Sequence, residues 1–204
     1  MLASITPLGE RARGRRWGVT VPFYVGASML GGAALGALAG GLGHLVALAT
    51  HPSAAAVLAV AAALSLAALA VDVRIFGDSV PGVHRQVNEN WLVRYRGWAY
   101  GVGFGTQLGF GVVTIVSTAA VYLMVGLSLL AGTVVGGASV GAVFGLVRAL
   151  PVLLAARATT FARLGALHRS VGAWEKKAHG VTIGTEAIVG VAAAVALAGG
   201  GSWS

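Results

Sequence analysis

The chain has 204 residues, of which 57% are hydrophobic and only 10% are charged, and its mean hydropathy is +0.84. Soluble domains carry about 25% charged residues, so the composition excludes a water-soluble fold and predicts an integral membrane protein. The lack of cysteine excludes disulfides and thiol chemistry within the chain, and the net charge of +8 indicates topology anchors rather than a nucleic-acid surface.

Five long apolar runs follow one another, and each approaches or exceeds the roughly 20 residues that a helix needs to cross a bilayer. They predict a single integral membrane domain over residues 1–204, with transmembrane helices at about 19–49, 53–71, 98–125, 127–156 and 181–198. The expected fold is all-α, a polytopic bundle of about five transmembrane helices. Because the first, third and fourth runs are over-long, six crossings are the alternative, with one run split or re-entrant.

The basic residues predict the orientation, because cytoplasmic loops of membrane proteins are enriched in Lys and Arg. They gather in three segments: Arg11, Arg13, Arg15 and Arg16; Arg74, Arg85, Arg94 and Arg96; and Arg157, Arg163, Arg169, Lys176 and Lys177. Five crossings from a cytoplasmic N-terminus place all three segments inside the cell and the C-terminus outside. The expected location is the inner (cytoplasmic) membrane.

Amphipathic segments are predicted on the cytoplasmic side of this bundle. Within residues 83–98, apolar side chains recur every three or four positions, namely Val83, Val87, Trp91, Tyr95 and Trp98. This pattern is typical of a helix that lies in the membrane interface. Its role is either a topological anchor or a docking face for a partner subunit or anionic lipid. A second interfacial helix is predicted over residues 161–178.

Glycines recur at every fourth position in three predicted spans, so they share one face of each helix. They are Gly32, Gly36 and Gly40; Gly97, Gly101, Gly105 and Gly109; and Gly137, Gly141 and Gly145. Small residues at this spacing let helix backbones approach closely in lipid. We therefore expect glycine-zipper packing within the chain, with an oligomer interface as the alternative.

Polar side chains at membrane depth are candidate functional residues, because their burial in lipid is costly. Arg148 and Glu186 each lie about two turns from the cytoplasmic end of a span, which predicts an ion pair between the two helices. The pair is either structural or has a coupling or gating role, and the alternative to a pair is that the two side chains snorkel toward solvent. Gln107, Thr106 and Thr114 predict backbone hydrogen bonds or, alternatively, a small polar cavity.

Two stretches carry a resemblance to a known family. YGVGFGTQLGFGVVTIVS, followed by GASVGAVFGLVRALPVLLAAR, resembles the later helices of the CcdA/DsbD-like and LysE-like transporter superfamily, over residues 97–156. The most specific part is the pattern of small residues, Arg and Pro from Gly141 to Pro151. The resemblance implies a transporter-like scaffold built from repeats of three helices. The redox branch of that family uses two membrane cysteines, which this chain lacks, so thiol electron transfer is not implied.

The sequence shows no Ser-His-Asp set, paired catalytic carboxylates, metal-ligand spacing or phosphate loop, so we expect no enzyme, cofactor or metal site. The favoured function is a non-catalytic membrane subunit or assembly factor of a larger membrane complex, with the lipid bilayer and other membrane proteins as partners. The alternative is a small-solute transporter on the CcdA/LysE-like scaffold. Transport is favoured less, because a solute pathway needs several polar groups that converge at the midplane.

Overall fold

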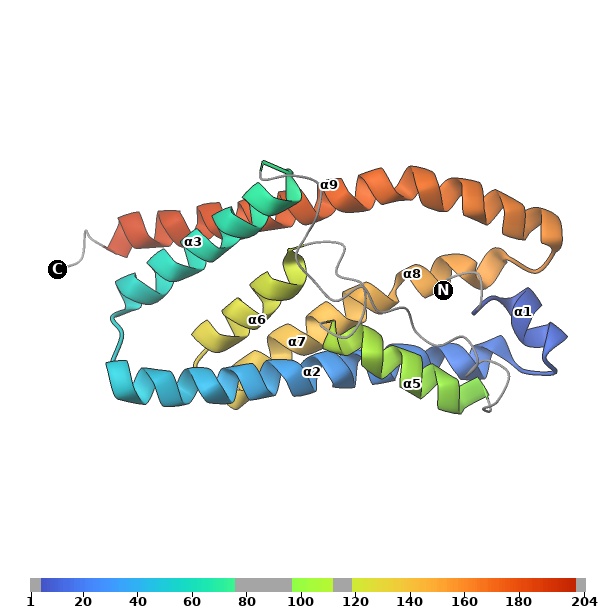
Figure 1. Cartoon of the computed structure of the whole chain (residues 1–204), viewed down its shortest axis with the longest axis horizontal. Helices are drawn as coiled ribbons and strands as arrows, with labels where there is room; N and C mark the ends of the chain where they lie inside the picture. The colour runs from blue at the N-terminus through green and yellow to red at the C-terminus, as the bar shows by residue number, and fades with distance from the viewer. Residues whose placement is uncertain (1–4, 76–96, 112–118, 201–204) are drawn as a thin grey trace.

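The computed structural model describes residues 5–75, 97–111 and 119–200, and the regular structure in these ranges is entirely helical, which confirms the expected fold class. The helices are α1 (Pro7–Ala12), α2 (Trp17–Thr50), α3 (Ala54–Asp72), α5 (Gly97–Phe110), α6 (Ala120–Leu130), α7 (Val134–Ala149), α8 (Pro151–Leu154), the 3₁₀ helix η1 (Ala155–Arg157) and α9 (Phe161–Gly200). In Figure 1, α2 and α9 follow the two long sides of the molecule. α5 and α7 pack on α2, α3 packs on α9, and α6 contacts both α2 and α3.

Four helical stretches in the described ranges are long and apolar enough to cross a membrane: Trp17–Thr50, Ala54–Asp72, Val134–Arg157 and His179–Gly199. The protein is therefore a multi-pass membrane protein. The expected spans at 19–49 and 53–71 correspond to α2 and α3. The number of full-length spans among the described residues is four rather than the five expected, because one predicted span is divided.

That divided span is the one expected at 98–125. Here α5 ends at Phe110, Gly111 adopts a left-handed φ of +63°, and α6 begins only at Ala120. A left-handed residue after the last helical turn ends a helix, and glycine adopts it at little cost. α5 and α6, with 14 and 11 residues, are each too short to cross a bilayer in regular helical form.

The joint expected between residues 125 and 127 is also displaced. Those residues lie inside α6, and the chain turns instead at Gly132, whose φ is +60°. Thr133 then caps α7 by accepting a hydrogen bond from the Gly136 N–H at 3.0 Å. The predicted span at 127–156 therefore contains the end of α6, this turn, α7, α8 and part of η1.

The turn at Gly132 allows a test of backbone strain without a packing change. An added Cβ there would meet only the Leu130 carbonyl oxygen, at 3.9 Å, so the cost of a side chain comes from φ. We expect Gly132→Ala to lower the free energy of unfolding by about 1 kcal/mol. Gly132→Asn should cost less, because asparagine tolerates left-handed φ better. Unfolding midpoints in detergent would measure both, and equal losses would contradict a strain mechanism.

The second interfacial helix does not form a separate element. α9 continues unbroken for 40 residues from Phe161 to Gly200, so the segments expected at 161–178 and 181–198 belong to one helix. The sequence around their junction contains Lys176 and Lys177, followed by His179 and Gly180, but no proline. Lysine is a good helix former, so polarity alone does not end the helix. Of the interfacial helix expected over 83–98, only the end at Gly97 and Trp98 is described, and it belongs to α5.

Candidate functional site

The helices α2, α5 and α7 meet backbone to backbone along their glycines. We call the contact of Gly32, Gly36 and Gly40 of α2 with Gly137, Gly141 and Gly145 of α7 the glycine seam. At five of these six positions an added Cβ would lie closer than 3.0 Å to a carbonyl oxygen of the other helix, and at Gly40 it would lie that close to the carbonyl oxygen of Thr133, the cap residue of α7. The Ser28 hydroxyl also donates to the Gly145 carbonyl at 2.7 Å. These glycine faces therefore make their contacts within the chain.

The glycines of α5 lie against the same helix, nearer its N-terminus. Added Cβ atoms at Gly101, Gly105 and Gly109 would lie closer than 3.0 Å to backbone oxygens of Thr20, Tyr24 and Ser28 of α2, respectively. At Gly97 the nearest atom is instead the Thr20 hydroxyl oxygen, at 2.8 Å. α2 is thus held between α5 and α7, which brings the start of α5 next to the N-terminal segment.

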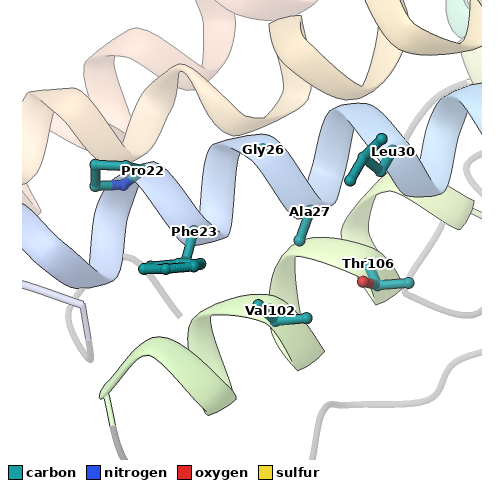
Figure 2. Close-up of a pocket in the computed structure, with 7 residues that line it drawn as sticks. All are labelled: Pro22, Phe23, Gly26, Ala27, Leu30, Val102 and Thr106. Carbon is teal, nitrogen blue, oxygen red and sulfur yellow. The ribbon is translucent and has the colours of Figure 1, made fainter.

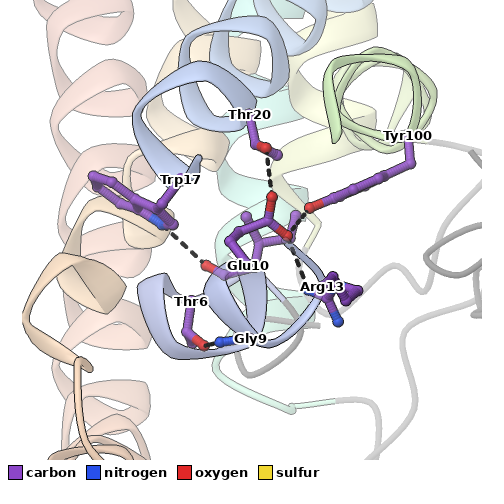
Figure 3. Close-up of polar contacts among 8 residues, drawn as sticks. Thr6, Gly9, Glu10, Arg13, Trp17, Thr20 and Tyr100 are labelled. Atoms are coloured by element: carbon purple, nitrogen blue, oxygen red, sulfur yellow. Dashed lines mark hydrogen bonds and ion pairs between the residues drawn. The ribbon is translucent and has the colours of Figure 1, made fainter. Parts of the chain in front are cut away.

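That N-terminal segment holds the buried carboxylate of Glu10. We call this carboxylate and its three hydrogen-bond donors the Glu10 cluster (Figure 3). Glu10 is fully buried. Its carboxylate accepts hydrogen bonds from the Thr20 hydroxyl at 2.6 Å, from the Arg13 guanidinium at 2.9 Å and from the Tyr100 hydroxyl. The Arg15 guanidinium lies 5.3 Å from the centroid of the Tyr100 ring. The cluster therefore ties α1 to both α2 and α5.

Electrostatics favours the ionised form of Glu10. Burial alone would raise the pKa of the carboxyl, but the hydrogen bonds from Thr20, Tyr100 and Arg13, with the charge of Arg13, hold the pKa below its ordinary value of 4.5. A buried carboxylate with three donors is satisfied and charged at neutral pH. The cluster is therefore suited to fastening the N-terminal segment rather than to exchanging protons there.

Sequence reasoning missed Glu10, although a local signal was present. Thr6 accepts a hydrogen bond from the Gly9 N–H at 3.0 Å and Pro7 occupies the first helical position, a typical helix start. That short helix places Glu10 opposite Thr20. The segment is further held by Trp17, whose indole N–H donates to the Ile5 carbonyl at 3.3 Å, and by the Leu8 N–H, which donates to the Ala158 carbonyl at 3.2 Å.

The ion pair expected between Arg148 and Glu186 is wrong. The Arg148 guanidinium lies 5.5 Å from the centroid of the Phe144 ring on its own helix and is in electrostatic contact with Tyr24 of α2. Glu186 instead faces Asp72 of α3, and both of its carboxyl oxygens are buried without a hydrogen-bond donor. The physical reason is helix pairing: α7 packs on α2 whereas α9 packs on α3, so equal depth does not bring the two side chains together.

Asp72 is a second buried carboxyl residue that sequence reasoning missed. It ends α3 with a side chain only 2% exposed, and its Oδ1 accepts a hydrogen bond from the Ala119 N–H at 2.7 Å. Glu186, opposite it, is 1% exposed. The available signal was a carboxylate at the last residue of an apolar run, where a solvated position at the end of the span is the ordinary interpretation.

The polar cavity expected at Thr106 and Gln107 is instead an apolar groove at Thr106. It has a volume of about 340 Å³, lies between α2 and α5, and is lined by Pro22, Phe23, Gly26, Ala27, Leu30, Val102 and Thr106 (Figure 2). Gln107 does not line it, and Thr114 lies outside the described residues. The Thr106 hydroxyl is the one side-chain polar group of the lining, so the groove suits apolar material such as lipid chains.

The docking face expected over residues 83–98 is described only at its end. Trp98 is 49% exposed, and its ring centroid lies 6.1 Å from that of Phe23. Val83, Val87, Trp91 and Tyr95 lie outside the described residues. In the ranges that are described, no group of three or more His, Cys, Asp or Glu side chains is placed to hold a metal ion.

These features define a class, a helical multi-pass membrane protein with apolar helices in contact with the bilayer. The chain is similar to the methylamine utilization protein MauF of Methylophilus methylotrophus, a distant homologue, with 32% identity over 161 residues. The match covers 74% of this chain and 53% of MauF, so the chain spans about half the length of that relative. Neither a protein-family profile nor a solved structure matches the chain. The CcdA/LysE-like resemblance therefore stays a prediction.

Proposed function

We propose that the chain is a non-catalytic accessory protein of methylamine utilization, acting as a subunit or assembly factor of a larger complex in the inner membrane. The similarity to MauF, whose name places it in methylamine utilization, carries this proposal. The proposal includes three further points: the chain has partner subunits, it catalyses no reaction, and its N-terminus lies in the cytoplasm.

The geometry supports a scaffolding role. The glycine seam and the Glu10 cluster fix α1, α2, α5 and α7 as one packed unit. Large apolar side chains on the outer faces of α2 and α9 remain exposed, among them Leu30, Leu38, Ile188 and Val195. Such faces suit lipid or the spans of another membrane protein, because association in a bilayer depends on close packing.

Deletion of the coding sequence in the native host tests the proposal. We expect loss of growth on methylamine but normal growth on a substrate that bypasses methylamine, with growth restored by the intact chain supplied in trans. Purification in mild detergent should yield a stoichiometric complex with other membrane proteins. Normal methylamine growth of the deletion strain would refute the proposed process, and a chain that purifies alone would refute the subunit role.

Transport of a small solute remains the second candidate, and one observation favours it. Asp72 and Glu186 are buried carboxyl groups at a helix pair of the membrane domain, and ionisable residues at such places mark ion and substrate pathways. A purified monomer or homodimer that moves solute across vesicle membranes would favour transport. Loss of that flux in Glu186→Gln, with the fold intact, would connect it to this pair.

A further inference from the structure

Two carboxylic acids face each other between α3 and α9. Glu186 lies inside the span His179–Gly199, Asp72 is the last residue of α3, and both are almost completely buried. In the described part of the chain, the Ala119 N–H donates to Asp72 Oδ1, while Asp72 Oδ2 and both oxygens of Glu186 have no donor. Three carboxyl oxygens are therefore buried without the partners that such atoms require.

Full ionisation of both acids is unfavourable at this position. Two adjacent negative charges would be removed from water, Glu186 with no donor and Asp72 with only the Ala119 N–H, too few to make burial of both carboxylates tolerable. Glu10 is the contrasting case in the same molecule, since three donors surround one carboxylate. Two carboxyl groups that share a site retain one proton, because the like charges oppose the second ionisation.

One proton also repairs the missing hydrogen bonds. Asp72 already accepts from the Ala119 N–H, so its side chain is placed as a hydrogen-bond acceptor. A proton on Glu186 turns that side chain into a donor, and one O–H bond to Asp72 Oδ2 would give Asp72 its missing donor and the Glu186 hydroxyl an acceptor. The two acids thus divide the roles of proton carrier and acceptor.

A third polar group lies along the same helix pair. The Ser65 hydroxyl is fully buried and has no partner among the described residues. Ser65, Ala68 and Asp72 are spaced three and four residues apart on the buried face of α3. A Cβ added at Gly190, one turn after Glu186, would lie 3.3 Å from the Cβ of Ser65. Ser65 therefore points toward α9, and its hydroxyl can both give and take a hydrogen bond.

Other titratable side chains on the neighbouring elements do not change this interpretation of Asp72 and Glu186. Four of them are exposed, namely Tyr122 of α6, Arg74 after α3, Arg157 of η1 and Lys177 of α9. His179 is half-buried. Asp72 is the charged group in electrostatic contact with Glu186 among the described residues. A calcium ion takes about six to eight oxygen ligands, more than these two acids and one hydroxyl supply.

We propose that Asp72 and Glu186, with Ser65 beside them, form a proton-binding site in the membrane domain that holds one shared proton at neutral pH. This site is independent of the accessory role proposed above. Its ligand is the proton itself, and it gives α3 and α9 a polar contact that depends on protonation.

Infrared spectroscopy of the purified intact protein in lipid tests the site without requiring reagent access. We expect a protonated-carboxyl C=O band at pH 7 that disappears on alkaline titration. Glu186→Gln should lack this band yet remain folded, because its amide can donate to Asp72 in place of the proton. Glu10→Gln should retain the band. Absence of the band at pH 7 in the unaltered protein, or its persistence in folded Glu186→Gln and Asp72→Asn alike, would overturn the proposal.

A hydrophobic carbodiimide locates the proton. The protonated carboxyl adds across one C=N bond of the reagent, its proton moves to nitrogen, and rearrangement gives a stable N-acylurea with no group lost. We expect one adduct on Glu186 at pH 7 and its loss at alkaline pH. Asp72→Asn removes the neighbouring charge and supplies an amide donor, so labelling of Glu186 and its infrared band at pH 7 should both decrease. Either of two results would refute the assignment of the proton to Glu186. One is an infrared band at pH 7 that survives in folded Glu186→Gln, and the other is carbodiimide labelling at Glu10.

Discussion

Gly36→Ala should lower the free energy of unfolding by about 3 kcal/mol, the upper end of the cost of overpacking a close-packed site. A methyl group at Gly36 would lie within 3.0 Å of both the carbonyl carbon and the carbonyl oxygen of Gly137. These are backbone atoms of α7 and cannot rotate away, so α2 and α7 must separate. Separation would lengthen the Ser28–Gly145 hydrogen bond and loosen the whole glycine seam. Thermal unfolding in detergent would measure the loss.

The same substitution elsewhere on α2 provides the matched control. An added Cβ at Gly26 has no atom within 4 Å, so Gly26→Ala introduces no clash. Alanine is favoured over glycine inside a helix by about 1 kcal/mol, so this variant should be at least as stable as the natural chain. The two alanine variants should therefore shift the unfolding midpoint in opposite directions. A similar decrease in both would mean that detergent effects, rather than seam contacts, explain the result.

Glu10→Ala should cost about 3 kcal/mol and release the N-terminal segment, because removing one member of a buried charged network leaves its partners unsatisfied. Thr20 and Tyr100 are both fully buried and would lose their acceptor. Limited trypsin digestion should then cleave at Arg11 or Arg13 much faster than in the unaltered chain. Arg13→Ala should cost less, about 1 kcal/mol, because that side chain is 26% exposed and water can replace it. Unchanged digestion of Glu10→Ala would refute the fastening role.

Acid should weaken the same cluster. The pKa of Glu10 is below 4.5 in the folded chain and returns to its ordinary value on unfolding, so ionised Glu10 contributes stability above pH 4.5. That contribution is lost as the pH falls below 4.5 through the pKa of the folded state. The difference in unfolding midpoint between the unaltered protein and Glu10→Gln should therefore shrink between pH 6 and pH 3. A constant difference would mean that Glu10 does not titrate in the fold.

The membrane class and the first two spans could be predicted from the sequence, because a bilayer requires long apolar helices and leaves a strong compositional pattern. The break at Gly111 could not be predicted. Gly111 lies in a run that also contains Gly105 and Gly109, and what distinguishes it is a left-handed φ that composition does not report. Likewise, His179 and Gly180 resemble a boundary, yet α9 passes through them without interruption.

The polar residues were harder to assign than the spans. Depth along a helix was available from the sequence, and it placed Arg148 and Glu186 at equal levels. The sequence does not report which helices are neighbours, and the neighbouring helix determines the partner of each side chain. Tyr24 faces Arg148, and Asp72 faces Glu186. Glu10 was overlooked because it precedes the first span among arginines, where a solvated position is the usual expectation.

The unbroken course of α9 has a mechanical consequence. Forty helical residues extend for about 60 Å, twice the roughly 30 Å of a bilayer's hydrocarbon core. The apolar stretch His179–Gly199 uses about half of that length, so the half that begins at Phe161 projects beyond it as a stiff lever arm. Without a hinge between the two halves, a push or twist applied at the Phe161 end reaches Glu186 directly, as displacement of a rod rather than through a chain of side-chain rearrangements.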